Sequence, residues 1–88
     1  MSDTALLYHR RPKTSVAVTL AGASPEVLRG RGLILLHNHP SGNPYPSLED
    51  VRTSRSVVAL ARMMGARLLD HVITADGARF SFRDEGLI

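Results

Sequence analysis

Short apolar runs separated by polar turns define most of the chain. The β-branched run at residues 16–20 (VAVTL) predicts a strand. Residues 33–36 (LILL) form a continuous apolar run, which is typical of a central strand buried on both faces of a sheet. Residues 68–74 and 79–82 lie on either side of a turn at residues 75–77, and this arrangement predicts a hairpin.

Two further segments carry helix signals. Ser24 can cap a helix that has Pro25 at its first position, but Gly30 limits that helix to about two turns. Between residues 48 and 64, apolar side chains recur at spacings of three, four and seven, and Gly65 follows as a C-terminal cap. The second segment therefore predicts a long amphipathic helix.

The order of these elements indicates the fold class. A strand, a short helix, a strand, a long helix and two strands predict an α/β domain with a small mixed β-sheet flanked by helices. The length of 88 residues fits one domain over residues 1–88, and we expect residues 1–15 to be flexible. A domain this small has a limited core, so a bound metal or a homodimer partner would help to stabilise it.

Composition and charge narrow the classes of function. Apolar residues make up 43% of the chain, and the lack of cysteine excludes disulfides and thiolate metal sites. The net charge is +3, but the basic residues are scattered and aromatic residues are few, which favours a solvated surface over a nucleic-acid groove. No apolar run approaches the ~20 residues that span a bilayer, and no signal peptide is evident. We therefore expect a cytoplasmic protein without a membrane partner.

The stretch HNHPSGNPYPSLED holds the candidate chemistry of the chain. His37 and His39 are two residues apart at the end of a strand, so they project from one face with Cα atoms ~6.6 Å apart. Asp50 lies in the first turn of the long helix, where it could complete a site of two imidazoles and one carboxylate, with water as the fourth zinc ligand. Alternatively, Ser47 and Asp50 form a capping box that only starts the helix.

These residues carry a resemblance to a known family. His37-x-His39, seven residues and Ser47-x-x-Asp50 match the signature of the JAMM (MPN) metalloproteases without a gap. Together with LLDHVIT and SFRDEGL later in the chain, the stretch resembles the RadC-like JAB domains over residues 33–87. This resemblance implies a JAB/MPN-like fold.

The resemblance also implies a mechanism. It assigns Zn²⁺ to His37, His39 and Asp50, and it assigns Ser47 to stabilising the oxyanion of the tetrahedral intermediate. In the wider family, zinc-bound water attacks a peptide or isopeptide bond, and a glutamate on an early strand acts as general base. The expected partner is therefore a peptide or protein substrate, whose identity the sequence does not define.

The N-terminal third departs from the family pattern. The strand predicted at residues 16–20 contains no acid, and the acids before His37 are Asp3 and Glu26. Glu26 is the candidate base, although it matches a helical position of the family. Two alternatives to a hydrolase therefore stay open: a non-catalytic metal-binding or protein-interaction module, and a nucleic-acid-associated accessory domain.

Two residues of the LLDHVIT run lie outside the signature. We expect His71 to have a core role or to lie beside the metal ligands, because no second ligand stands at a suitable spacing. We expect a structural role for Asp70, with orientation of a ligating histidine as the alternative.

Overall fold

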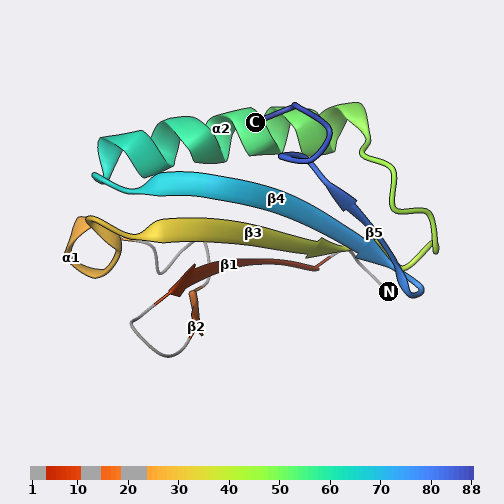
Figure 1. Cartoon of the computed structure of the whole chain (residues 1–88), viewed down its shortest axis with the longest axis horizontal. Coiled ribbons are helices and arrows are strands. Elements are labelled where there is room, and N and C mark those ends of the chain that lie inside the picture. The colour runs from red at the N-terminus through yellow and green to blue at the C-terminus, as the bar shows by residue number, and fades with distance from the viewer. Residues whose placement is uncertain (1–3, 11–14, 19–23) are drawn as a thin grey trace.

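The chain forms a five-stranded mixed sheet with one long helix (Figure 1). The computed structural model describes residues 4–10 and 15–18 by their backbone and residues 24–88 in full. The strand order is β2-β1-β3-β4-β5; β3 and β4 are parallel and the other pairs are antiparallel. The predicted α/β class with a small mixed sheet is thus confirmed. The elements are β1 (Thr4–Arg10), β2 (Ser15–Val18), α1 (Pro25–Leu28), β3 (Gly32–Asn38), α2 (Leu48–Met63), β4 (Arg67–Ala75) and β5 (Ala78–Ser81).

Helix α2 connects the two parallel strands and covers one face of the sheet (Figure 1). Parallel neighbours need a crossover connection, and this helix provides it. It runs from Leu48 to Met63 between the caps Ser47 and Met64, close to the predicted bounds. The core lies between α2, β3 and β4, and α1 adds one side chain to it. The buried core cluster comprises Leu28, Leu33, Leu35, Val57, Ala61 and Leu68.

Strand β3 is buried on one face only, so the prediction that this run is buried on both faces is wrong. Leu33 and Leu35 face α2 with no exposed surface, whereas 37% of Ile34 between them is exposed. The physical reason is that α2 covers one side of the strand, while α1, only four residues long, does not cover the other.

Strand β1 is an element that the sequence analysis does not predict. It lies between β2 and β3 and pairs antiparallel with both, with Ala5 opposite His37. Residues 4–10, which belong to the segment expected to be flexible, thus form a strand of the sheet. The predicted strand at residues 16–20 is confirmed for the part within β2, and residues 19–20 lie outside the described chain.

The β4–β5 hairpin closes through the predicted turn. Asp76 and Gly77 both have positive φ angles of 48° and 82°, as the central residues of a type I′ turn require. None of the helices in the described segments is long and apolar enough to cross a membrane.

The pairing of β3 with β4 contains a register shift that positions one buried histidine. Leu33 pairs with Leu68, but the next residue, Ile34, pairs with Asp70, so β4 carries one extra residue at this point. Side chains alternate strictly in a regular strand, so residues 68 and 71 would otherwise face opposite sides. Here both Leu68 and His71 are buried.

Candidate metal centre

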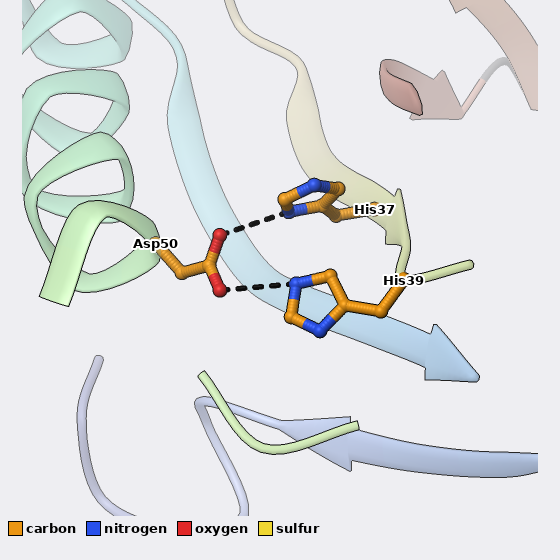
Figure 2. A group of neighbouring side chains, drawn as sticks. All are labelled: His37, His39 and Asp50. Carbon is orange, nitrogen blue, oxygen red and sulfur yellow. Dashed lines mark ion pairs between the residues drawn. The ribbon is translucent and has the colours of Figure 1, made fainter. Parts of the chain in front are cut away.

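Three side chains converge where β3 ends and α2 begins (Figure 2). His37 belongs to the last part of β3, His39 follows the strand directly, and Asp50 lies in the first turn of α2. His37 Nδ1 is 3.2 Å from Asp50 Oδ1, and His39 Nε2 is 3.0 Å from Asp50 Oδ2. One ligand atom from each residue lies within 4.8 Å of the other two. The structure thus brings together the three predicted ligands.

The Asp50 carboxylate is fixed by the helix cap. Its Oδ2 accepts a hydrogen bond from the Ser47 backbone N–H at 2.8 Å, and the Asp50 N–H donates to the Ser47 hydroxyl at 3.1 Å. This is the predicted capping box, and it coexists with the contacts to both histidines because each carboxylate oxygen has two lone pairs. The sequence left open whether Asp50 caps the helix or binds a metal. The contacts show that one carboxylate can do both.

The charge state of Asp50 follows from the same contacts. Only 5% of the residue is exposed, and this burial would by itself raise the pKa of the carboxyl. Hydrogen bonding with Ser47 and the two adjacent imidazoles outweighs burial, so the pKa of Asp50 lies below its ordinary value of 3.8. The residue is a carboxylate at neutral pH, as a metal ligand must be.

The loop after β3 orients His39. Its Nδ1 lies 2.9 Å from the Asn43 carbonyl oxygen, an acceptor, so Nδ1 carries the proton and donates. The other nitrogen, Nε2, lies 3.0 Å from Asp50 Oδ2, and in the neutral tautomer it has the lone pair that a metal ligand needs. Asn43 is positioned in turn by Ser41, whose hydroxyl accepts from the Asn43 N–H at 3.4 Å. Sequence reasoning assigned the loop a shaping role but did not identify this carbonyl, which carries no side-chain signal.

The geometry of the cluster suits a tetrahedral metal ion. At the usual metal–ligand distances, neighbouring ligand atoms of a tetrahedral zinc site are ~3.3 Å apart. The nitrogen–oxygen separations of 3.2 and 3.0 Å, each to a different oxygen of Asp50, are close to that spacing, and one ligand atom from each residue lies within 4.8 Å of the others. Two imidazoles and one carboxylate suit a first-row transition metal better than calcium or magnesium, which prefer oxygen ligands. The residues therefore fit a metal of this class.

Ser47 lies next to the cluster, and its predicted role requires that its hydroxyl donates a hydrogen bond to an oxyanion. The residue is exposed next to the cluster, and its hydroxyl oxygen is engaged as acceptor of the Asp50 N–H. A hydroxyl also has one proton to donate, and the capping contact does not use it. That proton remains available for a ligand oxygen.

The structure does not bring Glu26 to the cluster. Glu26 is exposed on α1, which precedes the start of β3, whereas His37 lies near the end of that strand. The five residue steps from Gly32 to His37 alone span about 16 Å. Asp3 lies outside the described residues. Within the described part of the chain, Asp50 is the only carboxylate in the cluster, and a general base is therefore not identified there.

His71 forms a stack beneath the cluster. It has no exposed surface and lies between two rings, with centroids 6.0 Å from His37 and 4.3 Å from Phe82. Burial, followed by the proximity of His37, lowers the pKa of His71 to about 4, so the ring is neutral. Neither of its nitrogens has a hydrogen-bond partner among the described residues. The expected core position beside the ligands is thus observed, whereas the contact with Phe82 has no signal in the sequence.

Asp70 has a structural role at the end of β5. Its carboxylate accepts from the Ser81 hydroxyl at 2.6 Å and from the Arg83 N–H at 3.0 Å. These bonds attach the C-terminal segment to β4. They do not orient a ligating histidine, which was the alternative for this residue.

The fold and the site together define a class of protein: an α/β domain with a His-x-His pair at a strand end and a carboxylate on the following crossover helix, a group that could hold a metal ion. The profile of the RadC-like JAB domain matches residues 27–87, which is most of the chain. The protein therefore belongs to the RadC-like JAB domain family, a branch of the JAMM/MPN superfamily.

Individual relatives agree with this assignment. A UPF0758 protein of Aquifex aeolicus is 43% identical over 61 residues, which cover 69% of this chain and 26% of the relative. A UPF0758 protein of Symbiobacterium thermophilum is 38% identical over 85 residues, covering 97% of this chain and 33% of the relative. The chain thus spans about a quarter to a third of the length of these curated relatives.

Proposed function

We propose that the domain binds zinc through His37, His39 and Asp50 and hydrolyses peptide or isopeptide bonds. The observation that carries the proposal is the convergence of two imidazole nitrogens on one buried carboxylate, at separations of 3.2 and 3.0 Å. Zinc is the metal that most often combines such ligands with an open position for water. Membership of the RadC-like JAB family supports the type of reaction.

The residues of the chain have separate tasks in this proposal. Zinc, when bound, would supply a Lewis acid and an activated water. Hydrogen bonds with Ser47 favour the ionised form of Asp50. In the neutral tautomer of His39 in which Nδ1–H donates to the Asn43 carbonyl, Nε2 is the nitrogen that would bind the metal. The Ser47 hydroxyl proton would stabilise the oxyanion that develops on a peptide carbonyl.

A second candidate is a non-catalytic metal-binding module for protein interaction. The observation that favours it is that Asp50 is the only carboxylate of the cluster among residues 24–88, where side chains are described. Hydrolysis needs a group that takes the proton of the attacking water, and Asp50 is already committed to the cap and the histidines. Metal binding does not need such a group.

Metal analysis and cleavage assays separate the candidates. We expect the purified protein to bind about one zinc ion per chain, which elemental mass spectrometry measures. Fluorogenic peptides and an ε-linked lysine isopeptide then serve as substrates, with chelator-treated protein and Asp50→Asn as controls. Zinc with cleavage that both controls abolish supports the hydrolase, and zinc without cleavage supports the binding module. A protein that takes up no zinc on titration excludes both.

A further inference from the structure

A groove lined with arginines runs between α2 and the C-terminal segment, and none of the three candidate metal ligands lines it. It has a volume of about 810 Å³ and is bounded by one side of α2, the start of β4 and the residues after β5. Figure 1 shows the C-terminal segment returning alongside α2. The basic residues that line the groove are Arg55 and Arg62 on α2, Arg67 at the start of β4, and Arg83.

The positive charge of this groove is not neutralised by the described residues. No acidic side chain lines it, and none of its four arginines forms an ion pair within residues 24–88. The one arginine–carboxylate pair in that range joins Arg52 to Glu49. Asp84 and Glu85 line a separate hollow beside Tyr45. Like charges held close together repel, so an anionic ligand would find a favourable field here.

The floor of the groove is aliphatic. Val58, Leu68 and Leu87 line it, whereas the Phe82 ring is 1% exposed and stacked on His71. Single-stranded nucleic acids are normally held by bases that stack on accessible aromatic side chains, and this groove offers none. Apolar side chains between carboxylates fit the floor better than bases do.

A buried hydroxyl also lines the groove without a partner. Ser54 is 3% exposed, and its Oγ has no hydrogen-bond partner in the described part of the chain. Buried polar groups are nearly always hydrogen-bonded. The Ser54 hydroxyl oxygen is itself buried, so a ligand oxygen would accept its proton only after the hydroxyl turns toward the groove.

We propose that this arginine-lined groove binds an acidic peptide segment in which carboxylates alternate with aliphatic residues. Arg55 and Arg62 are seven residues apart on α2, which separates them by about 10 Å along the helix axis. In the polyproline II conformation, which has three residues per turn, carboxylates three residues apart lie on one face and are separated by about 9 Å. The peptide would therefore place acids at every third position and aliphatic residues between them. This binding does not depend on the metal site.

Fluorescence anisotropy with a labelled ELVELVE peptide tests the proposal. We expect Arg55→Gln/Arg62→Gln to weaken binding about tenfold or more, because both charged contacts are lost. The matched control is Arg52→Gln/Arg79→Gln, which removes the same charge from exposed positions outside the groove and should change affinity less than about twofold. A QLVQLVQ peptide should bind at least about tenfold more weakly than ELVELVE.

Three outcomes would overturn the proposal. The first is an equal loss of ELVELVE binding in both double variants, which would mean that only net charge matters. The second is equal binding of ELVELVE and QLVQLVQ. The third is tighter binding of a dT12 oligonucleotide that the Arg55→Gln/Arg62→Gln variant abolishes, which would identify a nucleic-acid groove. Equal thermal midpoints of all variants establish that the substitutions leave the fold intact, since these arginines are exposed.

Discussion

Replacing Asp50 with asparagine separates metal binding from helix capping. The amide oxygen of asparagine can still accept the hydrogen bond from the Ser47 N–H, which is 2.8 Å long, so the start of α2 is retained. The negative charge between His37 and His39 is lost, together with the one anionic ligand of the cluster. We therefore expect a folded variant with a strongly reduced zinc affinity.

The size of the effect can be worked out from the ligand set. Loss of a residue that only supports a metal ligand costs 10–100-fold in affinity, so loss of Asp50 itself should cost at least about 100-fold. At free zinc about 1,000 times the wild-type Kd, binding stabilises the wild type by ~4 kcal/mol and a 100-fold weaker variant by ~1.4 kcal/mol. For a domain of this size the zinc-induced rise in Tm should then be about 10–20 °C smaller in the variant.

Differential scanning fluorimetry in zinc buffers measures this difference. Glu49→Gln is the matched control, because it removes a neighbouring carboxylate that contacts exposed Arg52 and not the histidines. This control should show the full wild-type rise in Tm. The same zinc-induced rise in Asp50→Asn as in wild type would refute the assignment of Asp50 as a metal ligand.

Three further predictions follow from the described contacts. Ser47→Ala should lower the free energy of unfolding by about 1 kcal/mol in urea unfolding, because the helix cap is lost. In zinc titration it should lose less affinity than Asp50→Asn does, and equal losses would contradict the assignment of Ser47 as cap and Asp50 as ligand. Because the pKa of His71 is lowered from 6.5 to about 4, the unfolded state binds more protons than the folded state between these values, and the unfolding free energy of metal-free protein should fall by roughly 3 kcal/mol from pH 6.5 to pH 4. His71→Leu should flatten this part of the stability–pH profile, and an unchanged slope would contradict the contribution of His71. Leu35→Ala should cost about 2–5 kcal/mol in urea unfolding and Ile34→Ala much less, since only the first is fully buried; similar costs would mean that both faces of β3 are covered.

The local order of the site explains why the capping box and the metal cluster occur together. A helix that is capped by Ser47 and begins at Leu48 presents its third residue, Asp50, back toward the cap, and the same turn faces the end of β3. The hydrogen bonds that start the helix therefore also hold the carboxylate in place before any ion binds. Such preorganisation lowers the conformational entropy lost on metal binding.

Much of the candidate site is determined by the sequence alone, because its geometry is local. The spacing of His37 and His39 places both on one face of any strand, and the position of Asp50 after Ser47 places it in the first helical turn. The long helix and the hairpin are also predictable, since each follows from side-chain periodicity and turn residues within a few positions. These features need no information from distant parts of the chain.

Only the tertiary structure decided the features that depend on contacts between distant segments. The pairing of β1 with β3 and the open face at Ile34 depend on which elements become neighbours, and no local periodicity encodes that choice. The register shift between β3 and β4 turns His71 toward His37, although regular alternation from Leu68 would turn it away. Likewise, the groove arginines are scattered through the sequence, and they line one surface because α2, β4 and the C-terminal segment pack together.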